Sequence, residues 1–221
     1  AERQVALTMK GMYERGFNCY LAVDRTADDK ITYLKDLHSI KKQIEILSDI
    51  DTEDKNILGY EIIEENIELL NLLNSTTKNK IKRLVSYFIR NKPDVIHAWQ
   101  DETILTAFVA CCLTDRPQLI GSARSLRPDE KSELHIRKRP YLRECMKMIL
   151  EKDWFTFTIN SKAGRKSYAD WLQIDEDNIK IIHNGTDFES MERGINIGLI
   201  KNEITELGIY KDNIIIGGVF R

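Results

Sequence analysis

The chain has 221 residues, of which 42% are hydrophobic, and its 33 Lys and Arg nearly cancel its 35 Asp and Glu. This length and apolar content fit about one or two domains with a substantial core. The balanced charge excludes a global field that would attract nucleic acid or an anionic membrane, so a charged partner must be met by a local patch.

The cysteines and the apolar runs narrow the class further. No apolar run approaches the length of about 18 residues that spans a bilayer. The cysteine spacings match neither a zinc site nor a small disulfide framework, so we expect reduced thiols, no metal and a cytoplasmic location. The four cysteines are Cys19, Cys111, Cys112 and Cys145.

The first half of the chain alternates helical periodicity with short apolar strands. A helix over residues 2–15 ends at Gly16, which suits a helix C-cap. Strands are then predicted over residues 17–23 and 43–47, and helices over residues 30–39, 60–73 and 80–90.

The second half repeats a unit of strand, loop and helix. Strands alternating with helices imply right-handed parallel βαβ units, so we expect an α/β fold with a Rossmann-like parallel sheet and helices on both faces. The predicted strands are residues 94–97, 117–122, 154–159 and 179–182, and the predicted helices are residues 102–113, 140–150 and the segment from N-cap Ser161 to Leu172.

Polar side chains cluster directly after the strand at residues 94–97. Ligands of open α/β sheets bind outside the carboxyl ends of the strands, which places His97, Trp99, Gln100 and Asp101 where a ligand is expected. Three of them have a structural alternative: His97 as a hydrogen-bonding residue at the sheet edge, Trp99 as a packed side chain of the loop, and Asp101 as an N-cap, which is the favoured interpretation of Asp101.

Arg124 directly follows the next predicted strand and opens the densest cationic segment, residues 124–143. Its guanidinium is suited to a bidentate contact with a phosphate or carboxylate. The remainder of the segment has two interpretations. One is a solvated loop, the usual outcome for a run of charges, and the other is a loop that binds a lipid-linked phosphate or membrane headgroups.

Both ends of the chain differ from those expected of a complete Rossmann-like protein. Residue 1 already belongs to a helical pattern, whereas such sheets normally begin with a strand and a glycine loop. The chain ends at Arg221, after a helical stretch over residues 196–207 and a strand over residues 213–220. We therefore expect truncation at both ends, with domains over residues 1–186 and 187–221.

The order and spacing of six landmarks resemble a family 4 retaining glycosyltransferase. These enzymes have the GT-B fold, in which two Rossmann-like domains face each other across a cleft, and the resemblance runs from residue 1 to Arg221. The landmarks are ERQV at residues 2–5, PDVIHAWQD at 93–101, SARS at 122–125, RPY at 139–141, NSKAG at 160–164 and IHNGTD at 182–187.

The resemblance implies transfer of a sugar from a nucleotide-diphosphate sugar to a hydroxyl of a glycan or lipid-linked acceptor, with retention, in cell-surface glycan biosynthesis. Arg221 would face the donor diphosphate, whereas Trp99, Gln100, Asp101 and Arg124 would bind the acceptor. Asn184 and Gly185 would form the interdomain hinge. No cofactor, metal or nucleic acid is implied, a peripheral contact with the inner face of the membrane is compatible, and this part alone would be inactive.

His97 is the candidate catalytic residue, although many relatives carry the corresponding histidine two positions later, where this chain has Trp99. Two further hypotheses stay open at this point. The chain is compatible with a non-catalytic Rossmann-like binding or interaction module, since fold alone does not imply function. It is also compatible with another GT-B enzyme, such as a sugar-nucleotide epimerase.

Overall fold

The computed structural model describes residues 2–23, 44–46, 75–128, 141–186 and 206. The chain forms two compact units, residues 1–185 and 186–221, and all but two of the described residues belong to the first. The elements predicted over residues 30–39, 60–73, 196–207 and 213–220 lie wholly or almost wholly outside the described residues.

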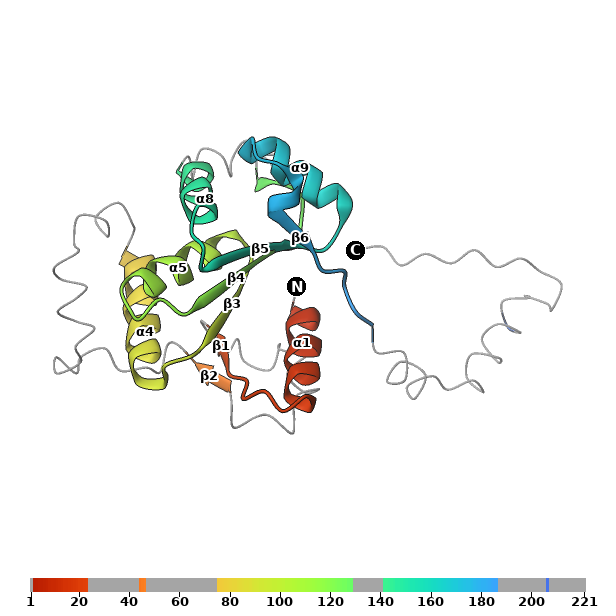
Figure 1. The fold of residues 1–221 in the computed structure, drawn as a ribbon. Helices are drawn as coiled ribbons and strands as arrows, with labels where there is room; N and C mark the ends of the chain where they lie inside the picture. Colours follow the sequence, from red (N-terminus) through yellow and green to blue (C-terminus); the bar gives the residue numbers. More distant parts are fainter. Residues whose placement is uncertain (1, 24–43, 47–74, 129–140, 187–205, 207–221) are drawn as a thin grey trace. The chain divides into compact units, whose positions relative to one another are not determined.

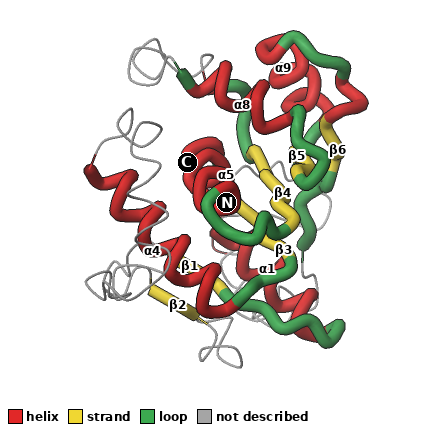
Figure 2. Tube along the Cα trace, turned by 60° about the vertical axis from the view of Figure 1, so that its left-hand side comes forward, coloured by secondary structure: helices red, strands yellow, loops and turns green. Residues whose placement is uncertain are grey.

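A four-stranded parallel sheet forms the centre of the first unit. Its strands lie side by side in the order of the sequence, as Figure 2 shows. Apolar runs flanked by charged or turn residues form these strands, close to where the sequence predicts them. The predicted Rossmann-like α/β fold is therefore confirmed. The strands are β3 (Val95–Trp99), β4 (Gln118–Ala123), β5 (Phe155–Ile159) and β6 (Ile179–Ile181).

Helices connect successive strands, as right-handed parallel crossovers require. Since the strand order follows the sequence, these connections place their helices on one face of the sheet, which we call the helix face. Figure 1 shows α1 (Glu2–Glu14) on the opposite side from α4 and α5. The helices of the helix face are α5 (Asp101–Cys112), α8 (Leu142–Leu150) and α9 (Lys162–Leu172), with α4 (Ser75–Asn91) packed on α5 and a 3₁₀ turn at Glu176–Asn178 before β6.

The N-terminal elements form a smaller assembly within the same unit. After α1 the chain turns at Gly16, which has a φ of 84°. This left-handed conformation suits glycine and confirms the prediction that the helix ends there. The strands β1 (Leu21–Val23) and β2 (Ile44–Ile46) then pair in parallel. Ala6 and Met9 of α1 are buried here.

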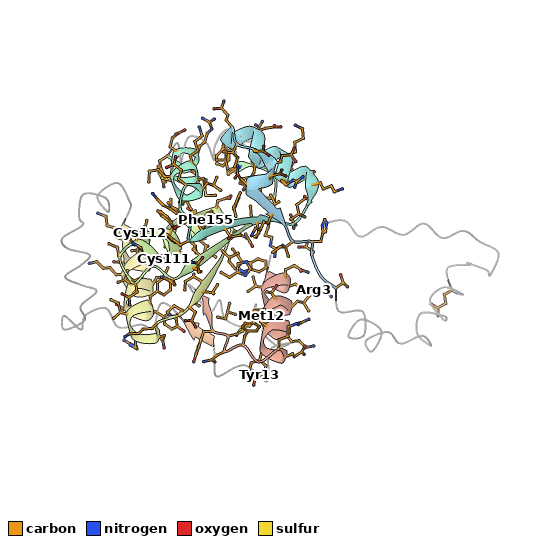
Figure 3. All side chains as sticks on the ribbon, viewed as in Figure 1. Arg3, Met12, Tyr13, Cys111, Cys112 and Phe155 are labelled. Atoms are coloured by element: carbon orange, nitrogen blue, oxygen red, sulfur yellow. The ribbon has the colours of Figure 1, made fainter. Side chains whose placement is uncertain are left out.

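The two faces of the four-stranded sheet carry different side chains. Because side chains alternate along a strand, every second residue contacts the helices. On the helix face, Gly121 allows a close approach, since a Cβ there would lie 2.8 Å from Cζ of Phe155, which is labelled in Figure 3. The apolar residues on this face include Ala98, Leu119, Ala123, Phe157, Ile159 and Ile179, all in the main core.

The other face, which we call the polar face, carries His97, Trp99, Ser122, Thr158 and Lys180 at the alternating positions. The candidate functional site lies on this face.

Two further findings bear on the sequence predictions. All four cysteines are free thiols, with Cys111 buried and Cys112 exposed at the end of α5 (Figure 3). Within the described ranges, the structure holds no helix that is both long and apolar enough to cross a membrane.

Candidate functional site

The four strands end at the same edge of the sheet, and polar residues follow each of them. Gln100 comes after β3, Arg124 after β4 and Asn160 after β5, while His183 lies two residues beyond β6. Backbone bonds hold the strand ends in line beyond the strands themselves, including one from the Gln100 amide to the Ser122 carbonyl oxygen at 2.9 Å. This carboxyl edge is where open α/β sheets place ligands.

Trp99 belongs to the sheet, whereas the sequence predicts it in the following loop. It is the last residue of β3 and pairs with Ser122 of β4. The strand runs further than predicted because its ladder with β4 continues to the Gln100 amide. The indole therefore lies on the polar face beside the His97 imidazole, with ring centroids 4.6 Å apart.

A row of hydrogen bonds crosses the polar face from β3 to β5. His97 Nε2 lies 2.7 Å from Ser122 Oγ, and Ser122 Oγ lies 2.5 Å from Thr158 Oγ1. Thr158 Oγ1 in turn donates to the carbonyl oxygen of Gly121 at 3.2 Å. We call His97, Ser122, Thr158 and this carbonyl the hydroxyl relay. Ser122 and Thr158 are almost fully buried, so their hydroxyls need these partners.

Arg124 lies over the same aromatic side chain. Its guanidinium carbon is 3.8 Å from the centroid of the Trp99 ring, a cation–π contact, and Nη1 donates to Asn184 Oδ1 at 2.9 Å. Arg124 Nε is buried and has no hydrogen-bond partner among the described residues. In that part of the chain no carboxylate pairs with Arg124, so its charge is available to an anionic or strongly polar group.

Burial and charge keep His97 neutral. Desolvation lowers the pKa of His97 to about 4, and the nearby charge of Arg124 contributes in the same direction. Desolvation also lowers the pKa of Arg124, which nevertheless stays charged at neutral pH because arginine pKa values start above about 12. The pair therefore combines a permanent cation with an uncharged imidazole.

Gln100 and Asp101 differ in their surroundings. The N-cap of α5 is Gln100, which has a φ of 75° and makes no capping bond through its side chain, so the favoured interpretation of Asp101 as N-cap is wrong. Asp101 instead lies in the first turn and accepts a hydrogen bond from the Tyr168 hydroxyl of α9 at 2.6 Å. The fold brings the buried Tyr168 next to this carboxylate, and the sequence alone does not predict this contact.

The segment after β6 runs along the same edge. His183 Nδ1 lies 3.2 Å from the Asn160 carbonyl oxygen. The Gln4 side chain of α1 donates to the Gly185 carbonyl at 2.7 Å and accepts from the Gly185 amide at 2.9 Å. Gly185 does not have a positive φ. The Asn-Gly pair therefore does not form the tight turn with positive φ for which its sequence is suited.

The structure brings together four of the predicted site residues, His97, Trp99, Arg124 and Asn184. Gln100 is exposed at the same edge, Asp101 contacts Tyr168, and Gly185 contacts Gln4. Arg221 lies outside the described residues. The catalytic, binding and hinge roles expected of these residues stay predictions.

Sequence reasoning missed Ser122 and Thr158, which complete the hydroxyl relay. A signal for Thr158 was present in β5, where threonines alternate with buried apolar residues over Phe155–Ile159. That alternation marks one polar face, unlike the continuous apolar run of a strand buried on both sides.

The basic segment 124–143 is described only at its two ends. At one end, the Arg127 amide donates to Ser167 Oγ at 3.2 Å. At the other end, Arg143 Nε donates to the Trp171 carbonyl at 2.6 Å, and its guanidinium lies 3.5 Å from Glu144. These contacts connect the ends of the segment to α9, so Arg143 has a structural role.

The protein is thus a Rossmann-like α/β protein with a polar site at the carboxyl edge of its parallel sheet. The family model for Glycosyltransferase Family 4 matches residues 1–190, and the chain belongs to this family. It is also 26% identical over 196 residues to the Vi polysaccharide biosynthesis protein VipC/TviE of Salmonella typhi. That match covers 86% of this chain and 32% of the relative, so the chain spans about a third of the length of that protein.

Proposed function

We propose that this chain is the acceptor-side part of a glycosyltransferase that acts in glycan biosynthesis. The enzyme moves a sugar from a nucleotide-diphosphate sugar to a hydroxyl acceptor, a glycan or a lipid-linked glycan, with retention at the anomeric carbon. The observation that carries the proposal is the cluster of His97, Trp99 and Arg124 at the carboxyl edge, within a segment that matches the family. The relative's name, a polysaccharide biosynthesis protein, supports the pathway class.

The chemistry of the cluster suits a sugar acceptor. A neutral imidazole can accept a hydrogen bond from a hydroxyl, and an indole offers an apolar face to a sugar ring. The Arg124 guanidinium, with which no described carboxylate pairs, suits a phosphate or carboxylate on the acceptor. The exposed Gln100 adds an amide that both donates and accepts, and Asp101, which accepts from the Tyr168 hydroxyl, adds a carboxylate at the same edge.

The other roles complete a GT-B enzyme that works in the cytoplasm, with a peripheral contact at the inner face of the membrane. Arg221 contacts the donor diphosphate and stabilises the charge that develops as it departs. Asn184 and Gly185 form the hinge between the domain of residues 1–186 and the domain that begins at residue 187. His97 orients the acceptor hydroxyl in the reacting complex.

The test uses the protein encoded by the complete reading frame that contains this chain. A panel of nucleotide sugars is screened first by thermal shift, and the donor that stabilises the protein is then supplied with glycan acceptors. We expect release of the nucleoside diphosphate and a glycoside with the anomeric configuration of the donor. Arg124→Ala should raise the acceptor KM by about 10- to 100-fold, because a hydrogen bond to a charged group is lost.

A matched control separates this effect from general damage. Cys112→Ser changes an exposed side chain at the far end of α5 and should leave KM and kcat unchanged. A full-length protein that binds no nucleotide sugar would contradict the proposal and favour the non-catalytic module. Formation of an epimerised nucleotide sugar without an acceptor would instead identify the epimerase.

A further inference from the structure

The hydroxyl relay contains one group that can only accept hydrogen bonds, and this group fixes the direction of all the others. The Gly121 carbonyl oxygen accepts from Thr158 Oγ1 at 3.2 Å, so the Thr158 proton is committed to it. Either hydroxyl could be the donor across the 2.5 Å between Ser122 Oγ and Thr158 Oγ1, and with the Thr158 proton on the carbonyl oxygen the donor is Ser122. The Ser122 oxygen can consequently only accept from His97.

This direction determines which nitrogen of His97 carries the proton. Nε2 lies 2.7 Å from Ser122 Oγ, and in this arrangement of donors Nε2 is the protonated nitrogen. A neutral imidazole has one protonated nitrogen, which leaves Nδ1 with a free lone pair. Among the described residues, no hydrogen bond reaches Nδ1.

We propose that Ser122 and Thr158 are positioning residues that hold His97 as the Nε2–H tautomer, so that Nδ1 forms an acceptor subsite for a hydroxyl group of the bound ligand. That this hydroxyl belongs to a sugar rests on the proposed function. The tautomer itself rests only on the relay.

The subsite has a defined specificity. A lone pair at Nδ1 binds a group that donates a hydrogen bond, such as a hydroxyl, and repels the oxygens of a phosphate or carboxylate. Arg124, which contacts the same Trp99 ring, has the opposite preference because a guanidinium only donates. The two neighbours therefore distinguish the hydroxyl of a ligand from its anionic group.

The first test is the tautomer of His97 in the full chain labelled with ¹⁵N-histidine. Long-range ¹H–¹⁵N correlation spectra report which ring nitrogen is protonated, and the chain has only four histidines. His97→Gln identifies the His97 signals. We expect neutral His97 with Nε2–H at pH 7, and an Nδ1–H or doubly protonated ring would overturn the proposal.

His183 provides an internal control in the same spectra. Its Nδ1 faces the Asn160 carbonyl oxygen, which can only accept, so His183 should show a protonated Nδ1, the opposite arrangement to His97. It lies outside the relay, so its pattern should not respond to changes in Thr158.

Thr158→Val tests the relay itself, because valine keeps the shape of threonine and removes only the hydroxyl. Ser122 then loses its acceptor and can donate to His97 Nε2, so we expect the Nδ1–H tautomer to become at least half of the population. Thr158→Ser retains a hydroxyl and should keep the original tautomer. An unchanged His97 spectrum in folded Thr158→Val would overturn the proposal, and the unmodified chain decides the tautomer even if this variant fails to fold.

Kinetics of the protein from the complete reading frame separate the relay from the proposed function. Thr158→Val should raise the acceptor KM about 5- to 10-fold with a smaller effect on kcat, whereas Thr158→Ser should match the parent enzyme. If the tautomer responds as expected and no sugar is transferred, the proposed function fails and the relay stands. If transfer occurs and Thr158→Val changes neither spectrum nor KM, the relay fails and the function stands.

Discussion

The helix face and the polar face of the four-stranded sheet belong to the same strands but carry different kinds of side chain. On the helix face, Phe157 and Leu119 are each 1% exposed and belong to the main core. On the polar face, the alternate positions of the same two strands hold Ser122 and Thr158. These two side chains bond to each other, and Ser122 also bonds to His97. A shift of one residue in register would exchange these two sets of side chains.

This difference indicates that side-chain alternation separates the packed core from the polar residues of the candidate site. The helix face contributes through burial of apolar surface, at about 25 cal/mol per Å². The polar face instead depends on buried hydroxyls whose partners must all be present. Substitutions on the two faces should therefore have different effects, and four measurements examine that contrast.

Removing a large side chain from the helix face should have the largest effect. Phe157→Ala leaves a cavity among packed residues, so we expect a loss of about 3–5 kcal/mol in the free energy of unfolding. The matched change Ile120→Ala, on the polar face, removes a side chain that lies outside the main core and should cost about 1 kcal/mol. Urea denaturation measures both, and equal losses would contradict the contrast.

The helix face should also reject added volume. Gly121→Ala places a Cβ 2.8 Å from Phe155 Cζ and 3.1 Å from Ile104 Cδ1, so we expect a loss of about 1–3 kcal/mol. Gly185→Ala is the control, because a Cβ there would meet no atom within 4 Å and the glycine does not have a positive φ. A neutral Gly121→Ala in thermal or chemical denaturation would show that the helices pack less closely than described.

The polar face should make stability depend on pH through His97. Its pKa is about 4 in the folded chain, below the ordinary value of 6.5, so the unfolded chain binds more protons between these values. The contribution of neutral His97 to the free energy of unfolding is then fully present above about pH 6.5, and it is lost as the pH falls toward 4. We expect a loss of about 2 kcal/mol between pH 7 and pH 5. In His97→Gln this part of the pH dependence should disappear, and an unaltered profile would contradict the buried neutral imidazole.

The smallest expected effects distinguish the two helix N-termini at the carboxyl edge. Ser161 caps α9 by accepting from the Gly164 amide at 3.1 Å, so Ser161→Ala should lower stability by about 1 kcal/mol. Gln100 precedes α5 with a φ of 75° and no capping bond, so Gln100→Gly should raise stability by about 1 kcal/mol. Changes of the same sign in denaturation midpoints would refute this distinction.

Sequence patterns predicted most of the described fold because buried apolar residues recur with the period of the helix or strand that carries them. The helical period over residues 80–90 became part of α4, and the apolar runs at residues 117–122 and 154–159 became β4 and β5 within one residue at either end. Ser161 was correctly identified as a cap because its capping bond spans only three residues. These features depend on neighbours in the sequence.

The site was predicted less completely because its contacts are distant in the sequence. Asp101 bonds to Tyr168, 67 residues away, and Ser122 bonds to Thr158, 36 residues away. Asp101 has the composition and position of an N-cap, and only the packing of α9 against the sheet edge gives its carboxylate a different partner. Such a pairing has no local pattern.

By itself, the sequence determined the alternation of helices and strands, the position of the strand-end cluster and the resemblance to its family, since each follows from local periodicity or ordered spacing. The tertiary structure alone decided that Trp99 ends a strand, that Arg124 lies over its ring, and that Ser122 and Thr158 join His97 in a hydroxyl relay. The reason is physical: parallel pairing of β3, β4 and β5 aligns residues from three separate segments, and their hydrogen bonds exist only after that alignment.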